Sequence, residues 1–159
     1  MAYPVITNYA DNYSDPLAEA VAGVQLVRPI KVTMLIGAAS VIALAPLPIW
    51  PNFVLDGFVL DIPVWDTGSP ALTLDVGDVN TQALFVSAST AGQAGGRISS
   101  YEGTVGVILG TLPRQYSAAY SATPNSLILS VVNAAGTAAT ATLIGQMLYH
   151  LTGYPFGNP

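Results

Sequence analysis

From residue 24 onward, the chain consists of short apolar or alternating runs separated by Gly, Pro, Asn and Ser. Apolar and polar residues alternate most clearly in residues 72–76 and 127–132, where β-branched residues add to the strand preference. The pattern predicts nine short strands, at residues 24–27, 31–36, 40–44, 53–62, 71–76, 83–88, 104–109, 126–133 and 138–149. Short strands at this spacing predict an all-β domain, an antiparallel β-sandwich or jelly-roll-like fold over residues 24–159.

The last predicted strand, residues 138–149, also has a helical alternative because its alanines favour a helix. Thr137, Thr140 and Thr142 and the flanking Gly136 and Gly145 favour a strand instead. Two loops are predicted between strands. Residues 90–96 form a small, Gly-rich loop that is expected to be flexible, and residues 112–125 form an excursion containing tyrosines and prolines.

Residues 1–23 differ from the rest, because residues 1–13 have no periodic apolar face and read as an extended arm. Ser14, Asp15 and Pro16 followed by Glu19 form a helix-start pattern: Ser or Asp can cap, and Pro fits the first turn. Gly23 can end this helix. The predicted organisation is an N-terminal arm with one short helix, then the β-sandwich domain.

A run of 17 residues without charge, residues 34–50, has to be weighed as a membrane span. It contains Gly37, Ser40, Pro46 and Pro48, and Pro51 follows directly. Such breakers favour two short strands and a turn over a continuous helix, so no membrane partner is expected.

Charge is scarce along the whole chain. Of 159 residues only 8% are charged, against about 25% in an average soluble domain, and the net charge is −5. Four scattered cations make no basic stripe, so nucleic acid is not an expected partner. After Arg114 the remaining 45 residues carry no Asp, Glu, Lys or Arg. A surface that lacks charge is typical of subunits that are permanently assembled.

A cluster of carboxylates, Asp56, Asp61, Asp66, Asp75 and Asp78, falls within 23 residues. Oxygen ligands near a turn are suited to calcium, but the spacing does not match the EF-hand loop. Two carboxylates at a suitable separation are also the machinery of glycosidases. The commoner role of such residues is to accept hydrogen bonds from backbone N–H groups in turns.

The sequence gives little support for catalysis or for a cofactor. There is no cysteine, no Gly-x-Ser-x-Gly motif and only one histidine, His150, near the C-terminus. Gly92, Gly95 and Gly96 lack the Lys and Ser/Thr of a phosphate-binding loop. We therefore predict no enzyme activity, no catalytic residues, no metal and no cofactor.

Aromatic residues are the candidates for contacts with other subunits, because Tyr and Phe bury a large area at low entropic cost. Three tyrosines lie on the arm and others lie towards the C-terminus. The predicted interface residues are Tyr3, Tyr9, Tyr13, Tyr116, Tyr120, Tyr149, Tyr154 and Phe156. The alternative is that these rings pack within their own chain.

Residues 53–149 carry a pattern that resembles a known group. The motif Leu-Asp-Val-Gly-Asp ends a predicted strand at residues 74–78, the Gly-rich stretch follows at residues 90–96, and a closing block spans residues 127–138. This pattern resembles small virion proteins of tailed bacteriophages, of the capsid decoration (cement) type. The resemblance implies a β-rich, often homotrimeric structural protein on the capsid surface. It would bridge capsomers of the major capsid protein, and no catalytic residue carries over.

Two other functions remain open from the residues alone. The same composition suits a low-copy structural component of a tail, neck or fibre. A carbohydrate- or calcium-binding β-sandwich would instead use the aspartate cluster together with exposed Tyr or Trp.

Overall fold

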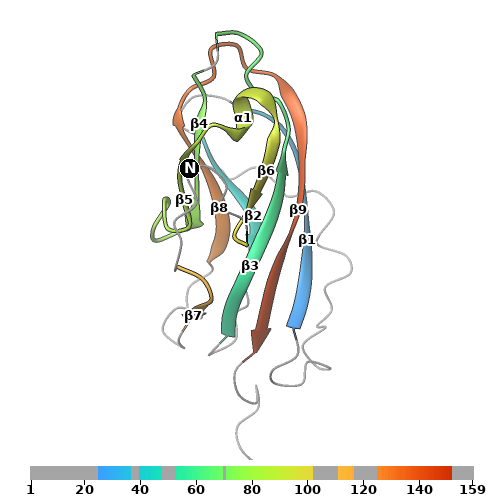
Figure 1. Cartoon of the computed structure of the whole chain (residues 1–159), viewed down its shortest axis with the longest axis vertical. Helices are drawn as coiled ribbons and strands as arrows, with labels where there is room; N and C mark the ends of the chain where they lie inside the picture. Colours follow the sequence, from blue (N-terminus) through green and yellow to red (C-terminus); the bar gives the residue numbers. More distant parts are fainter. Residues whose placement is uncertain are drawn as a thin grey trace, which may run out of the picture.

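The computed structural model describes residues 25–36, 40–47, 53–69, 71–101, 111–116 and 125–151. These residues form strands and one short helix, in an arrangement that Figure 1 shows with the long axis of the molecule vertical. In chain order the elements are β1 (Gln25–Leu35), β2 (Val41–Pro46), β3 (Phe53–Ile62), β4 (Thr73–Asp78), β5 (Val86–Ser89), α1 (Ala91–Ala94), β6 (Gly96–Ser99), β7 (Arg114–Tyr116), β8 (Ser126–Asn133) and β9 (Thr140–Leu151).

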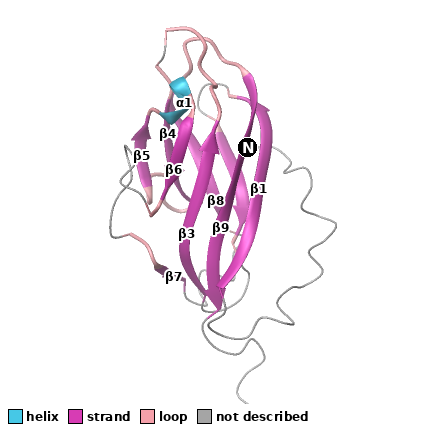
Figure 2. Ribbon diagram, turned by 45° about the vertical axis from the view of Figure 1, so that its right-hand side comes forward, coloured by secondary structure: helices cyan, strands magenta, loops and turns pink. Residues whose placement is uncertain are grey.

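The strands build two antiparallel sheets that pack face to face (Figures 1 and 2). The first sheet has the order β1-β9-β3-β6, with β7 pairing to one end of β3, and the second has the order β2-β8-β4-β5. The chain passes repeatedly between the two sheets, with β4 and β5 in one sheet and β6 and β7 in the other, and this strand order is the topology of a jelly roll. The predicted all-β sandwich is confirmed.

Alternating burial explains why these segments form strands. In β1, Arg28, Ile30 and Val32 are buried while the residues between them are exposed, as expected for a strand with one covered face. β8 lies centrally in the second sheet, and its residues are buried from Leu127 to Val131. Between the sheets, the ring of Phe58 packs against the ring of Phe85 at a centroid distance of 5.8 Å.

Most predicted strands appear, two of them with the predicted bounds. Residues 53–62 and 126–133 are strands β3 and β8, and residues 140–151 are strand β9 rather than the alternative helix. The separate strands predicted at 24–27 and 31–36 are one strand, β1, that continues through Pro29. Among the described residues β1 pairs only with β9, and an edge strand tolerates a residue without an N–H group.

The prediction of a flexible loop at residues 90–96 is wrong. Residues 91–94 form helix α1 and Gly96 begins strand β6. Gly92 is buried against Leu72 and Leu74, and its carbonyl oxygen accepts hydrogen bonds from the backbone N–H groups of Trp65 (2.9 Å) and Asp66 (3.2 Å). Small residues here permit close packing of the backbone, and they do not indicate flexibility.

Two other predicted segments shift. The strand predicted at residues 83–88 is the shorter strand β5, and the excursion at residues 112–125 contains strand β7, which pairs with Phe53–Leu55 of β3. The arm with its helix at residues 1–23 and the strand predicted at 104–109 lie outside the described residues. Within the described part of the chain, no helix is long and apolar enough to cross a membrane.

At one end of the sandwich lie the β3–β4 and β8–β9 connections (Figure 1, top). Both donate backbone N–H groups to the carboxylate of Asp66. Asp66 is buried and follows the end of β3, within the connection to β4. Its two oxygens accept five backbone N–H groups: Gly68 (3.3 Å) and Thr137 (3.0 Å) on Oδ1, and Ala71 (2.8 Å), Leu72 (3.1 Å) and Gly136 (3.0 Å) on Oδ2. One side chain therefore joins the β3–β4 and β8–β9 connections.

The hydrogen bonds to Asp66 act on the charged form of the side chain. Backbone N–H groups of Ala71, Thr137 and Gly136 hold the pKa of the Asp66 carboxyl far below its ordinary value of 3.8, against the opposing effect of burial. Gly136 is required for this approach, because a Cβ at that position would collide with the carbonyl oxygen of Ser69.

We predict that Asp66→Asn lowers the melting temperature by roughly 5–10 °C. Whichever way the amide is turned, its NH₂ group faces at least two of the five N–H groups that the carboxylate accepts. Asp75→Asn is the matched control, because Asp75 accepts a single backbone N–H, from Ala88 at 2.7 Å, and is expected to cost about 2 °C or less.

The difference between wild type and Asp66→Asn should also depend on pH. Because folding lowers the pKa of Asp66, its stabilisation is complete above the unfolded value of 3.8 and is lost as the pH falls from there towards the folded value. Thermal unfolding at several pH values should therefore show the two proteins converging below pH of about 4. Equal melting temperatures at pH 7 would contradict the role assigned to Asp66.

Candidate functional site

The five clustered aspartates do not come together as one site. Asp75 accepts the N–H of Ala88, while Asp78 Oδ1 accepts the N–H groups of Asn80 (2.9 Å) and Thr81 (2.8 Å). Together with Asp66, three of the five aspartates thus accept backbone hydrogen bonds in turns and connections. This confirms, for these three, the interpretation that the aspartates accept hydrogen bonds from backbone N–H groups. In the described ranges, no group of three or more Asp, Glu or His side chains is placed to hold a metal ion.

The other two aspartates pair with side chains on the first sheet. Arg97 of β6 donates to Asp61 of β3 through Nε (2.7 Å) and a second nitrogen (3.3 Å), a bidentate ion pair on the surface. Asp56 lies next to His150, whose Nδ1 is 2.9 and 3.0 Å from the two carboxylate oxygens, and Gln25 Nε2 donates to it at 3.4 Å.

The Asp56–His150 pair has two members of a catalytic triad but not the third. Within the part of the chain that the structure describes, no hydroxyl group hydrogen-bonds to the His150 ring. Both side chains are partly covered, and the pair joins the end of β9 to β3. Its observed role is to connect strands that are distant in sequence.

Two of the predicted interface tyrosines are buried inside the chain. Tyr116 is 1% exposed, stacks on Phe53 at a centroid distance of 4.8 Å, and donates its hydroxyl hydrogen to Asp78 Oδ2 at 3.0 Å. Tyr149 is also 1% exposed, and the Arg28 guanidinium lies 5.7 Å from its ring centroid. For these two rings the alternative of packing within the chain holds, because their surfaces are already covered. The remaining six, Tyr3, Tyr9, Tyr13, Tyr120, Tyr154 and Phe156, lie outside the described residues.

The buried contact between Tyr116 and Asp78 is electrostatically well matched. Burial and the neighbouring Asp78 carboxylate raise the pKa of the Tyr116 hydroxyl, so it stays protonated and remains a donor. Asp78 is fully buried, and its other oxygen is occupied by backbone N–H groups. The pair ties the end of β4 in the second sheet to β7 at the edge of the first.

The described surface most suited to contacts is the outer face of the first sheet, the side turned away from the second sheet. On this outer face, Val27 and Leu35 of β1 and Ile144 of β9 are about half exposed. Tyr101, which follows β6, is 59% exposed and lies across Gly57 of β3. A Cβ on Gly57 would collide with the Tyr101 ring, so glycine is needed for the ring to lie there.

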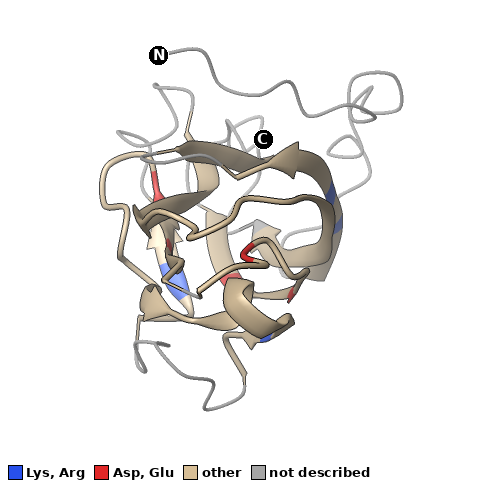
Figure 3. Ribbon diagram, turned by 90° about the horizontal axis from the view of Figure 1, so that it is seen from above, with Lys and Arg blue, Asp and Glu red and all other residues tan. Residues whose placement is uncertain are grey.

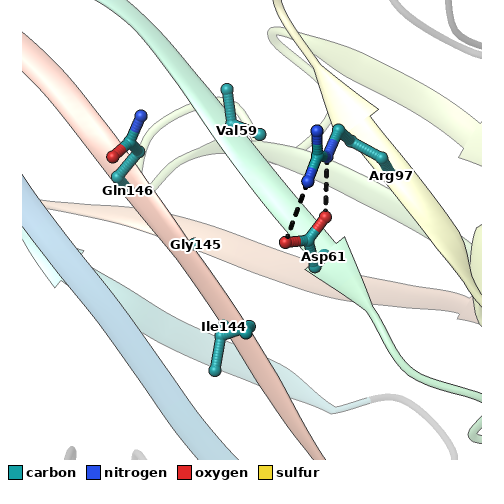
Figure 4. A pocket seen from close by; sticks show the side chains of 6 residues that line it. All are labelled: Val59, Asp61, Arg97, Ile144, Gly145 and Gln146. Atoms are coloured by element: carbon teal, nitrogen blue, oxygen red, sulfur yellow. Dashed lines mark hydrogen bonds and ion pairs between the residues drawn. The ribbon is translucent and has the colours of Figure 1, made fainter.

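An open hollow of about 400 Å³ lies on the outer face above β9 and β3 (Figure 4). Its lining residues are Val59, Asp61, Arg97, Ile144, Gly145 and Gln146. Gly145 faces the core side of β9, where a Cβ would strike the Val59 carbonyl oxygen and the buried Leu60. The lining combines aliphatic groups with a neutralised ion pair, which suits contact with an uncharged side chain of a partner.

The sequence contained a signal for this face that our strand predictions did not use. In β1 both alternating sets contain apolar residues, Ile30 and Val32 on the covered side and Val27 and Leu35 on the open side. A strand with one face in water normally carries polar residues on that face. The outer side of β1 is therefore less polar than a strand face in water normally is.

No known protein family matches the sequence, and no curated protein matches it. Solved structures do match the fold. A chain of the cyanophage Pam1 capsid asymmetric unit aligns with a TM-score of 0.60 and 22% identity, over 91% of this chain and 97% of that chain. A chain of the capsid of Ralstonia phage GP4 aligns with a TM-score of 0.62 and 23% identity, over 96% and 92%. At these identities the similarity establishes a shared fold over nearly the whole of each chain.

We predict that Tyr116→Phe destabilises the protein by about 1–3 kcal/mol, because it leaves one oxygen of the buried Asp78 carboxylate without its donor. The stacking of the ring on Phe53 is retained, so the loss reports on the hydrogen bond. Urea unfolding followed by circular dichroism measures the change. Tyr101→Phe is the control, since that ring is exposed, and an equal loss in both variants would argue against the buried pair.

Proposed function

We propose that this protein is a structural component of a tailed-phage capsid, located on the capsid surface, where it decorates and stabilises the shell by bridging capsomers of the major capsid protein. The observation that carries the proposal is the shared fold with chains from two phage capsid structures. The alignments cover more than nine-tenths of both partners in each case, so the similarity involves whole proteins of nearly the same size.

The composition supports a structural role in an assembly. Charged residues make up 8% of the chain, and Figure 3 shows how little of the described ribbon they occupy. Most charges in the described part are already paired within the molecule. Asp66 and Asp78 are buried on backbone or tyrosine donors, and Asp61 is paired with Arg97. Few charges are left to keep the surface hydrated, which favours a subunit whose surface is covered by neighbours.

A role without catalysis agrees with the chemistry of the described residues. The aspartates hold loops, and the Asp56–His150 pair joins two strands. The homotrimeric state is part of the proposal and is carried by the resemblance to decoration proteins. Residues 1–20 and the uncharged C-terminal third are the segments assigned to contacts with the major capsid protein and with sister subunits.

Quantification of this protein against the major capsid protein in purified particles tests the proposal. We expect hundreds of copies in a fixed ratio, because a decoration protein follows the capsid lattice. Mass spectrometry with isotope-labelled peptides of both proteins gives the ratio, and a known tail protein serves as the low-copy control. A handful of copies per particle would favour a neck, tail or fibre component, and absence from particles would refute a virion role.

Deletion of residues 2–13 tests the arm separately. We expect the truncated protein to retain the circular dichroism spectrum and melting temperature of the β-sandwich, because the two described sheets and their core involve residues 25–151. Binding to particles that lack the protein should be lost, which co-sedimentation measures. Binding equal to that of the full chain would show that the arm makes no essential contact.

A further inference from the structure

Among the described residues, the outer face of the first sheet carries one uncancelled charge of each sign, at opposite ends. Lys31 of β1 lies in register with Ile144 of β9, and Ile144 lies in register with Asp61 of β3. Asp61 is neutralised by Arg97, whereas Lys31 has no hydrogen-bond or ion-pair partner in the described part of the chain. This end of the face therefore has a net positive charge.

The opposite end of the face has a net negative charge. There the Asp56 carboxylate is held by His150 and by Gln25, whose positions on β9 and β1 are in register. The Gln25 amide donates a hydrogen bond that leaves the charge of Asp56 uncancelled, and His150 cancels that charge only when its ring is protonated. Along β1, Lys31 lies six residues from Gln25, which is a distance of about 20 Å. Across the sheet, Asp56 on β3 lies two strands from β1, which is a distance of about 10 Å.

The area between the two charges is uncharged. It consists of outward-facing residues in two rows across β1, β9 and β3: Val27, Leu148 and Gly57 in one row, and Pro29, Gln146 and Val59 in the other. A face with an uncharged centre and opposite charges equally far from that centre is complementary to itself. A two-fold axis lying between two such faces brings each positive end to the negative end of the other.

We propose that the outer face packs against the same face of a second copy of this chain, about a two-fold axis that passes over β9 between Gln146 and Leu148. In this arrangement Lys31 of each copy pairs with Asp56 of the other. The two ion pairs form at the rim of the contact, while the aliphatic residues of β1, β9 and β3 are buried at its centre.

The exposed ring of Tyr101 gives independent support for this axis. Tyr101 lies over Gly57, one row from the axis on the Asp56 side, and the hollow lined by Ile144, Gly145 and Val59 lies on the Lys31 side. Neighbouring strands are about 4.8 Å apart, and successive residues along a strand are about 3.4 Å apart. With these spacings, the two-fold axis that pairs Lys31 with Asp56 brings Tyr101 of one copy to within about one strand spacing of the hollow on the other copy. An aromatic side chain filling an apolar hollow is typical of the centre of a stable interface.

The inference does not depend on the proposed capsid role, because it concerns the purified chain. A closed trimer cannot be built from a face that meets itself across a two-fold axis. Any trimer therefore uses another surface, and the two contacts can coexist.

Cross-linking tests the contact cleanly, because the chain has no cysteine of its own. Gln146→Cys places a thiol close to the proposed axis, and the short cross-linker bismaleimidoethane should join two copies through it. Val132→Cys is the matched control, since Val132 is half exposed but lies on β8 of the second sheet. We expect dimers from Gln146→Cys at protein concentrations where Val132→Cys gives few.

Reversing the charge of Lys31 shows whether the proposed ion pairs between Lys31 and Asp56 determine how the two copies pack together. Lys31→Glu would face the partner's Asp56, so we expect the self-association constant from sedimentation equilibrium to fall by about tenfold or more. Lys31→Arg should retain association, and Tyr101→Ala should weaken it. Equal cross-linking of the Gln146→Cys and Val132→Cys variants would overturn the proposal, as would association that Lys31→Glu leaves unchanged.

Discussion

The hydrogen bonds to the carboxylate of Asp66 are the interaction on which one end of the sandwich depends. A jelly roll sends its chain repeatedly from one sheet to the other, so each connection brings backbone N–H groups into positions that strands cannot satisfy. Here the β3–β4 and β8–β9 connections direct five such groups to one buried side chain. A charged acceptor is the strongest available partner for backbone donors, and its cost of burial is offset by the number of hydrogen bonds.

The opposite end of the sandwich uses the same solution with different residues. Asp78 accepts the Tyr116 hydroxyl and two backbone N–H groups, and Asn125 Oδ1 accepts the N–H groups of Val79 (3.0 Å) and Ser126 (2.8 Å). Tyr116 pairs with Phe53 at the start of β3, whereas Asp66 follows the end of β3. The hydrogen bonds around Asp78 and those around Asp66 therefore close the core at its two ends. Three of the five acids in the described ranges, Asp66, Asp75 and Asp78, thus accept backbone N–H groups of the chain's own connections.

This internal use of charge has a consequence for the surface. In the described part of the chain, the uncancelled charges left on the outer face are those of Lys31 and Asp56, separated by uncharged residues. A nearly neutral, partly apolar sheet face is unfavourable in water and favourable in a contact. The proposed place in a capsid and the proposed pairing of copies both follow from this shortage of surface charge, although each rests on a different observation.

The amino-acid sequence by itself determined most of the longer strands, because a period of two in residues such as 72–76 and 127–132 is a local property of the chain. It did not predict the short strands β6 and β7. It also indicated that an aspartate such as Asp78 holds a turn, since its backbone N–H partners, Asn80 and Thr81, are near in sequence. Only the tertiary structure decided that Tyr116 and Tyr149 face inward, that Gly92 packs in a helix, and that His150 meets Asp56. These outcomes depend on contacts between residues far apart in the chain. Alternation of apolar and polar residues shows that a strand has two different faces, but the packing of one sheet against the other determines which face is covered.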